Sequence, residues 1–416
     1  MSTIHPISDP LPGEQLLALS PASSEAASRS WRRRPNLIPH RSLTASALNM
    51  RQRWAAGIGV LRGQVLTPGV VNGLDVEAIP LTAASGPSRV RISPGQGLTI
   101  SGEDVTLSRA VEVPLNALPV VLEGSIGDTL ESWRTRVADR PQAGVLLLQP
   151  VEFERADFDE NDPCDRCPCD GDEARLDDWR VVDGARLLWF AWPDDFGRDF
   201  QLTPGPLFRN QLAWSVFEAE SELSADDALP WERFGVPLAL IGLDATLQPS
   251  FVDRAAVVRR GGLDRDLRLS RSRDGDLVES WRLAGLWQAR IEHLAGHLLE
   301  LLGTGQDDGP AAVEAAVELW PPCGLLPRWS ADLESQHMAL FPPGFDLDAV
   351  PVPMDELDRM LQDSARQTPL HGSRAERVQV LVPVPGAFYD PRLLHDEAVD
   401  PLFNDCLLYT SDAADE

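Results

Sequence analysis

Three cysteines in one short acidic stretch come nearest, by type and spacing, to a site that could do chemistry. Cys164, Cys167 and Cys169 stand at spacings of three and two, and thiolate is a favoured ligand of Zn²⁺. A fourth ligand would come from Asp165, Asp170 or the distant Cys323. The sequence has no second cysteine or histidine pair at the spacing of a zinc finger or ribbon. Three interpretations therefore stay open, namely a structural zinc site, a disulfide and unliganded surface thiols.

Two histidines form a second candidate metal site. His293 and His297 are four residues apart and so share one face of a helix, which is the geometry of a two-histidine metal site. The residues between them are Leu294-Ala295-Gly296, so the general-base glutamate of a zincin is missing. Both histidines flank an apolar stripe, where a partly buried structural imidazole is ordinary. We favour the structural interpretation and keep the metal site as the alternative.

Other catalytic signatures are weak in this sequence. The chain has no lysine, which excludes a P-loop or Schiff-base lysine, and it has no Gly-x-Ser-x-Gly motif. The glycines between Gly57 and Gly63 follow a predicted helix, where a phosphate-binding loop would follow a strand. The aromatic strand Leu187–Trp192 lies in acidic surroundings, so we expect Trp189 and Trp192 in a core instead of on a base-stacking platform. We therefore predict no catalytic residues and lean towards a protein that is not an enzyme.

The charge balance bears on the partners. The chain has 64 acidic and 37 basic residues, for a formal net charge of −27. Such an excess repels phosphate backbones and anionic lipid, so the predicted partners are protein subunits and not nucleic acid or membrane. The sequence shows no secretory signal, and its longest apolar run, Val236–Leu243, is short of the roughly 18 residues that a membrane span needs. We expect a cytoplasmic or particle-associated protein without a cofactor, structural zinc excepted.

The last eleven residues need separate treatment. Cys406 to Glu416 read CLLYTSDAADE, which matches one reading frame of the transposase adapter used to prepare DNA libraries. We therefore expect the natural chain to be truncated at about Asn404 or Asp405, and residues 406–416 to be an artefactual tail. A tail of this kind should pack against nothing in particular.

Periodicity of the apolar residues divides the chain. Residues 43–54 fit a short helix with Ser42 or Thr44 as its N-cap and Gly57 and Gly59 at its end. From Val70 to Leu115 apolar residues alternate in short runs, separated by turns at 93–97 and 101–104, as in a small antiparallel sandwich or barrel. Apolar residues then recur at helical spacing from Leu283 to Leu301, ahead of Gly303 as the C-cap. The fold class is therefore α+β and multi-domain, with small antiparallel β modules followed by a helical segment.

The predicted domains follow these changes of period. They are a flexible arm (1–38), a helix with a small β module (39–118), a second β domain (119–260) carrying the acidic cysteine loop (157–178), a linker (261–277), a helical and Pro-rich region (278–405) and the tail (406–416). In the second β domain we expect helices near 129–137 and 209–223. In the Pro-rich region we expect helices at 310–319 and 355–364 and a strand at 378–384.

Several segments resemble a known group of proteins. They are Leu43–Trp54, Gly69–Val76 and Val90–Gly97, with Val236–Asp244, Arg259-Arg260, Leu381–Pro391 and Asp400–Phe403 later in the chain. In this order they are similar to uncharacterised structural proteins of phage-tail-like and contractile-injection gene clusters. The resemblance covers a minor part of the chain and implies a tail, baseplate or fibre-attachment part.

Three functions follow from these observations. The leading hypothesis is a non-enzymatic structural or assembly component of a phage-tail-like or contractile injection particle. The first alternative is a metal-dependent enzyme that uses the Cys164–Cys169 loop or the His293/His297 pair. The second alternative is a carbohydrate- or peptide-binding β-sandwich protein.

Overall fold

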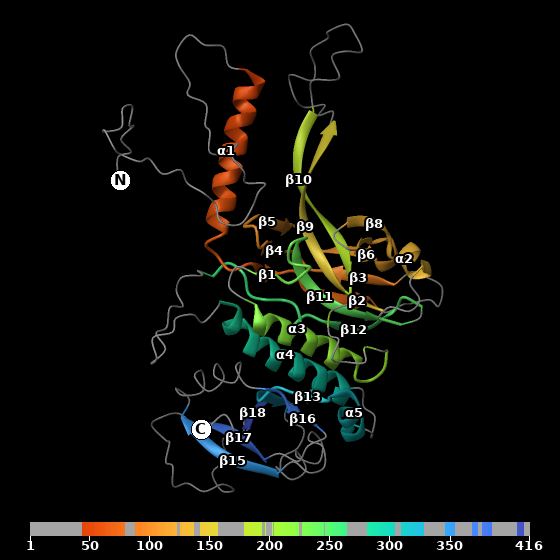
Figure 1. Ribbon diagram of the computed structural model, residues 1–416, viewed down its shortest axis with the longest axis vertical. Coiled ribbons are helices and arrows are strands. Elements are labelled where there is room, and N and C mark those ends of the chain that lie inside the picture. The colour runs from red at the N-terminus through yellow and green to blue at the C-terminus, as the bar shows by residue number, and fades with distance from the viewer. Residues whose placement is uncertain are drawn as a thin grey trace, which may run out of the picture.

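The structure is a computed structural model that covers the 416-residue chain. It describes residues 44–79, 88–122, 125–136, 142–156, 179–193, 196, 202, 204–223, 227–244, 246–263, 281–303, 309–327, 346–353, 368–372, 377–384 and 406–411. Figure 1 shows a β block with a helix and a long hairpin rising from it, a layer of helices below it, and a small sheet beyond these helices. The fold is α+β, as the sequence predicts.

Helix α1 (Ala45–Gly63) begins where the sequence places it and ends later. Thr44 is the N-cap, and its Oγ1 accepts a hydrogen bond from the Ala47 amide at 3.2 Å. The expected end at Gly57 and Gly59 is wrong, because glycine inside a helix costs only about 1 kcal/mol and does not by itself end it. In Figure 1 the helix and the hairpin both extend upward from the β block.

Two three-stranded antiparallel sheets follow α1. Strands β1 (Gly69–Gly73), β4 (Gly95–Leu98) and β5 (Asp104–Leu107) form one sheet in the order β1-β4-β5. Strands β2 (Val76–Ile79), β3 (Arg89–Ile92) and β6 (Val111–Pro114) form the other in the order β2-β3-β6. Residues 95–97, expected in a turn, are therefore part of β4. The strand runs close to its neighbours, since a Cβ on Gly95 would lie 2.3 Å from the Asn72 carbonyl oxygen.

The largest sheet has six strands in the order β12-β11-β9-β10-β7-β8. After the short 3-10 helix η1 (Leu115–Ala117), the chain forms β7 (Pro119–Leu122), β8 (Ser125–Thr129), helix α2 (Leu130–Arg136), β9 (Ala143–Ala156), β10 (Trp179–Ala191), β11 (Val236–Leu243) and β12 (Pro249–Asp253). All neighbours are antiparallel except β10 and β7, which are parallel. The segment 129–137 is helical at α2, as expected.

Both faces of the inner part of this sheet are buried, so the strand segments there are apolar on both sides. Leu146 and Leu148 of β9 join Trp189 in a core that includes Val70, Ile92 and other residues of the two small sheets. Val145 and Leu147 face the opposite side, where they join Phe190 and Trp192 in a core with α3. Trp189 and Trp192 are 0% and 1% exposed, which confirms their expected place in a core. The division between residues 118 and 119 stays a prediction, because side chains on both sides share the first core.

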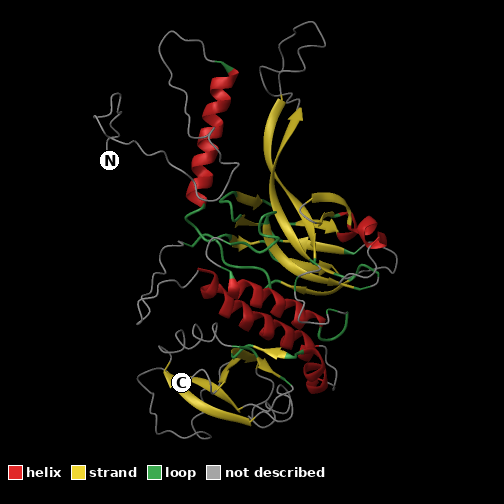
Figure 2. Ribbon diagram, viewed as in Figure 1, coloured by secondary structure: helices red, strands yellow, loops and turns green. Residues whose placement is uncertain are grey.

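Helices α3 (Phe208–Glu222) and α4 (Trp281–Gly303) lie against each other under the six-stranded sheet. Figure 2 shows the two as neighbouring red helices below the yellow β block. The helix expected at 209–223 and the stripe ending at Gly303 are both confirmed. Helix α5 (Gly309–Ala316) follows and ends before the expected Leu319, because Leu319 and Trp320 form β13. Among the described helices, none is long and apolar enough to cross a membrane.

The C-terminal strands lie beyond α4. Strand β13 pairs with β16 (Leu370–His371), and four further strands are ordered β14-β18-β17-β15. Their bounds are Cys323–Pro327 for β14, Asp346–Pro353 for β15, Arg377–Val384 for β17 and Cys406–Ser411 for β18. The strand expected at 378–384 is confirmed as β17, whereas the helix expected at 355–364 lies outside the described residues.

The expectation that the tail packs against nothing is wrong for Cys406–Ser411. This segment forms β18, whose backbone pairs with β14 from Cys323↔Thr410 to Pro327↔Cys406. It also pairs with β17 from Val378↔Ser411 to Leu381↔Leu408. The physical reason is that β-prone Leu407, Leu408, Tyr409 and Thr410 suit a strand, and the edges of β14 and β17 offer unpaired backbone groups.

Candidate functional site

Polar side chains are concentrated inside the helical layer. Helix α3 carries Arg209, Asn210 and Glu220, and helix α4 carries Arg282, Arg290, His293 and His297, all buried. Burying an unpaired charge is costly, so such groups are tolerated only with partners. The partners come from both helices, from β12 and the turn after it, from the segment before β11 and from β13. This network is the candidate site of the molecule.

Asp253 lies at the centre of the network. Its Oδ2 atom accepts a hydrogen bond from Arg209 Nε at 2.7 Å and lies 2.7 Å from His293 Nδ1. Its Oδ1 accepts a hydrogen bond from the Ala256 amide at 3.0 Å. Arg209 also donates from Nη1 to Glu300 Oε2 at 2.7 Å. One carboxylate at the end of β12 therefore joins α3, α4 and the turn that follows the strand.

The electrostatics of this centre favour the ionised carboxylate. Burial works to raise the pKa of Asp253, but the charges and hydrogen bonds of His293 and Arg209 hold that pKa well below its usual range. Burial likewise works to lower the pKa of Arg209, while Asp253 and Glu300 raise it above its usual value. The Asp253 carboxylate and the Arg209 guanidinium therefore stay charged across the neutral range.

His297 lies one helical turn from His293, with the ring centroids 5.9 Å apart. Burial, followed by the charges of Arg209 and His293, lowers the pKa of His297 to about 3. Asp253 opposes this shift without overcoming it. His297 is therefore neutral at physiological pH. Among the described residues, neither His297 Nδ1 nor His293 Nε2 has a hydrogen-bond partner.

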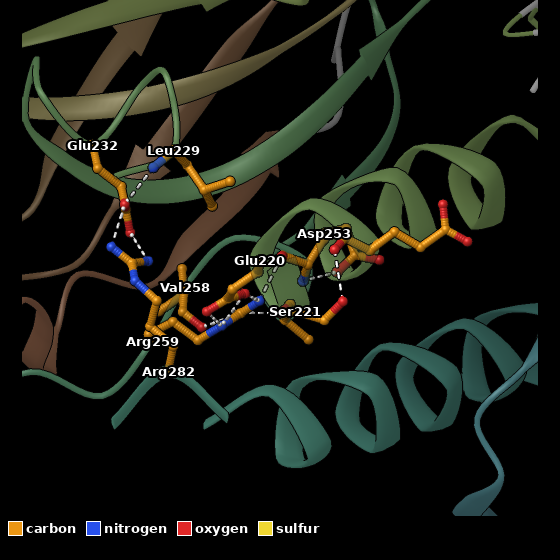
Figure 3. A network of polar contacts seen from close by, with 11 residues as sticks. Glu220, Ser221, Leu229, Glu232, Asp253, Val258, Arg259 and Arg282 are labelled. Carbon is orange, nitrogen blue, oxygen red and sulfur yellow. Dashed lines mark hydrogen bonds and ion pairs between the residues drawn. The ribbon is translucent and has the colours of Figure 1, made fainter. Parts of the chain in front are cut away.

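A second ion pair lies at the C-terminal end of α3. Glu220 and Arg259 are 1% and 8% exposed, and Arg259 Nε lies 3.0 Å from both carboxylate oxygens of Glu220, with Nη2 forming a further contact (Figure 3). Arg259 also donates to the carbonyl groups of Ala255, Ala256 and Val258. The guanidinium therefore holds its own turn in place as well as α3.

Arg290 and Arg282 complete the network from α4. The Arg290 guanidinium lies 5.1 Å from the centre of the Trp214 ring, and burial lowers its pKa to about 10 against the opposing charges of Glu220 and Glu218. Arg282 is bound by both carboxylate oxygens of Glu232, at 3.1 and 3.0 Å. Figure 3 shows this pair beside the Glu220–Arg259 pair. These contacts clamp α4 to α3 and to the segment before β11.

Asn210 connects helix α3 to the C-terminal strands. Its Oδ1 accepts hydrogen bonds from the amides of Glu318 and Leu319 at 3.2 and 2.9 Å. Its Nδ2 donates to the Leu319 carbonyl at 3.0 Å, and Trp214 Nε1 donates to the same carbonyl at 3.0 Å. The side chain thus replaces a backbone partner for β13, and the network spans all three layers. What the arrangement does chemically is hold these layers in one geometry.

Of the cysteines predicted as metal ligands, only Cys323 lies within the described residues. Cys164, Cys167 and Cys169 lie outside the described residues, as does the rest of the 157–178 loop. Cys323 is in β14, where its backbone pairs with Thr410. Within the described ranges, no three His, Cys, Asp or Glu side chains are grouped as metal ligands. The cysteine site therefore stays a prediction.

Apart from His293 and His297, the residues that form the network were not predicted from the sequence. His293 and His297 were noticed for their spacing, and the structure assigns His293 to Asp253. Arg209, Glu220 and Asp253 carry one available signal: in α3 and β12 they occupy positions that the apolar period places inside. A charged residue at a core position predicts an ion pair but not its partner.

Comparisons with known proteins give a likeness to a solved structure. No protein-family model matches the chain, and no curated protein matches it. Among solved structures, a chain described as "Crystal structure of TssK" is similar at 9% sequence identity, with a TM-score of 0.24. The match covers 81% of this chain and 59% of that chain. At this identity and TM-score the likeness assigns neither fold nor function, which rest on the residues described above.

Proposed function

We propose that this protein is a structural component of a larger protein assembly, of the phage-tail-like or contractile injection type. The resemblance of the segments from Leu43 to Gly97 and later in the chain suggests this class of particle. The network between α3 and α4 suits it, since an assembly part must keep one geometry under load. The observation that carries the proposal is a projecting two-stranded arm.

The arm is the outer half of the β9–β10 hairpin. Strand β11 pairs with β9 only from Ala143 to Leu148, and β7 pairs with β10 only at Trp189 and Phe190. Beyond these residues, Gln149–Ala156 pair with Trp179–Arg186 and with no other described strand. Figure 1 shows this part of the hairpin extending past the β block.

An isolated two-stranded hairpin is marginally stable in water, and its outer edges present unpaired backbone groups. A third strand or a neighbouring subunit would satisfy those groups by adding to an edge. The arm therefore has the properties of a subunit contact.

The test is co-assembly. The full chain is expressed with the proteins encoded beside its gene, and complexes are isolated by affinity purification and size-exclusion chromatography. One variant replaces residues 150–185 by a two-residue Asn-Gly turn. A matched control replaces only residues 157–178 and keeps both strands of the arm.

The proposal expects tail, tube or baseplate proteins among these neighbours, a stable complex with the full chain and the control, and loss of the complex with the arm deletion. A compact monomer that binds none of the neighbours would overturn it. If the control and the arm deletion assembled equally well, the arm would not be the subunit contact.

The metal-dependent enzyme stays the competing function. It rests on Cys164, Cys167 and Cys169, or on the histidine pair. Elemental analysis of the purified chain decides this point: one equivalent of zinc that is lost in the triple Cys→Ser variant would establish the metal site.

A further inference from the structure

Helix α1 stands apart from the cores of the molecule although it is one of its longest helices. Apart from Gly63 at its base, every residue of α1 whose burial is described is half-buried or exposed, including Met50 at 36%. Helices in proteins owe most of their stability to packing of an apolar face, and isolated helices are marginal in water. Two internal glycines, Gly57 and Gly59, weaken α1 further. Within the described residues, the helix is therefore short of stabilising contacts.

Six apolar residues of this segment nevertheless lie on one stripe, at steps of 3, 4, 4, 3 and 4, so that the pattern repeats after eleven residues. They are Ala47, Met50, Trp54, Ile58, Leu61 and, just past the helix, Val65, whereas Leu48 and Val60 lie on other faces of α1. An eleven-residue repeat stays on one side of a nearly straight helix. Val65 is 57% exposed and Met50 36%. The stripe is a seam of the length and shape that a second helix would cover.

The base of α1 is fixed to the β block, so the seam has a defined direction. A Cβ on Gly63 would lie 2.1 Å from the Gly102 carbonyl oxygen, which shows how closely the two backbones approach. Gln64 Nε2 donates to the Ser101 carbonyl at 2.9 Å. Such a helix is already held in place, which lowers the entropic cost of binding a partner.

The charge of α1 is opposite to that of the whole chain. Its charged residues are Arg51, Arg53 and Arg62, all exposed, and it contains no acidic residue. Arg51 and Arg62 are eleven residues apart and so lie on the same flank of the stripe. The chain as a whole carries a formal charge of −27. A partner that covers the stripe would meet cationic flanks.

We propose that α1 is a docking helix for an acidic amphipathic helix of another protein. Acidic side chains beside the seam would pair with Arg51 and Arg62, and apolar side chains would cover Trp54 and its neighbours. A second copy of α1 fits poorly, because it would bring arginine against arginine. Nucleic acid and anionic membrane fit poorly, because the rest of the chain repels them. This inference rests on the proposed function and names the chemistry of one partner.

The test uses a defined probe with the full chain. The probe is a labelled helical peptide with a leucine stripe flanked by glutamates, and its control carries lysine at every glutamate position. Binding is measured by fluorescence anisotropy, and hydrogen exchange locates the site. The charge variant is Arg51→Glu/Arg62→Glu and the seam variant is Trp54→Asp. The control, Arg109→Glu, changes an exposed arginine outside α1.

We expect the acidic peptide to bind at least tenfold more tightly than the lysine peptide and to slow exchange of the α1 amides. Both α1 variants should weaken binding at least tenfold, whereas Arg109→Glu should not. Equal binding of both peptides would overturn the proposal, as would equal binding by the charge variant. Protection of α1 by anionic phosphatidylglycerol vesicles alone would show that a membrane, and not a partner helix, binds this face. Protection on raising the concentration of the chain alone would show that a second copy binds it. None of these measurements uses the proteins encoded beside the gene, so the docking helix and the proposed assembly fail separately.

Discussion

Asp253 and His293 lie 2.7 Å apart, from Oδ2 to Nδ1, and each side chain is only 1% exposed. The same oxygen accepts a hydrogen bond from Arg209. One buried carboxylate therefore holds a residue of α3 and a residue of α4 at once. Because removing one partner from a buried ion pair leaves an uncompensated charge, this centre should be very sensitive to substitution.

Replacing Asp253 by Asn tests this sensitivity. Asn keeps the shape but removes the charge that compensates Arg209, so we expect the free energy of unfolding to fall by about 3–5 kcal/mol. Urea denaturation followed by circular dichroism measures it. The control is Asp75→Asn, which breaks the ion pair of a 54% exposed carboxylate with Arg254 and should cost about 0–1 kcal/mol. Similar losses in the two variants would show that the Asp253 centre does not hold the helices together.

The pH dependence of stability should reflect His297. Its pKa is lowered from the ordinary 6.5 to about 3, so the unfolded chain binds a proton that the folded chain excludes between these values. The contribution of His297 to the free energy of unfolding is therefore fully present above about pH 6.5 and is lost as the pH falls towards 3. Its slope can reach about 1.4 kcal/mol per pH unit. The groups that face His297 are Arg209, His293 and Asp253.

The measurement is the urea midpoint at pH 7.5, 6 and 5 for the full chain and for His297→Leu. We expect a shallower decline in the variant, because the excluded proton is gone. Parallel curves for the full chain and His297→Leu would contradict the assignment. Asp253 adds a further decline only below about pH 4, since its folded pKa lies below the unfolded one.

The Glu220–Arg259 pair predicts strong coupling. Glu220→Met alone leaves a buried guanidinium without its carboxylate, and Arg259→Met alone leaves the reverse, so each should cost about 3–5 kcal/mol. The double variant buries neither charge and should lose less than the sum of the two. We expect a coupling free energy of at least about 1 kcal/mol from a double-mutant cycle in urea. Additive losses would mean that the two side chains act separately.

The sequence predicts the elements of this fold better than their partners. Alternation from Val70 to Leu115 correctly indicates short strands, because the period of two is a local property. It does not tell that 95–98 and 89–92 belong to different sheets, since sheet membership depends on contacts far along the chain. The C-terminal end of α1 and the pairing of β18 cannot be predicted from this period, for the same reason. Gly63 approaches Gly102, and Cys406–Ser411 pairs with β14 and β17, only in the folded chain.

The candidate site shows the same limit. Helical spacing places His293 and His297 on one face, which the structure bears out through the 5.9 Å between their rings. The spacing carries no trace of Asp253, which is 40 residues away from His293 along the chain. An ion pair between distant residues leaves no periodic signal in one sequence. The partner can be identified only when the fold brings β12 to α4.

The attachment of α1 gives a last prediction, in which two glycines of one helix respond in opposite ways. A Cβ on Gly63 would overlap the Gly102 carbonyl, whereas a Cβ on Gly59 would meet nothing within 4 Å. Gly63→Ala should therefore loosen the base of α1, and Gly59→Ala should stabilise the helix by up to about 1 kcal/mol. Trypsin reports both effects, because the chain has no lysine and α1 carries Arg51, Arg53 and Arg62. Cleavage in α1 should become about tenfold faster in Gly63→Ala and no faster in Gly59→Ala, as expected when local opening controls proteolysis. If both variants were cleaved like the unaltered chain, the close contact of Gly63 with Gly102 would not be what fixes α1 to the β block.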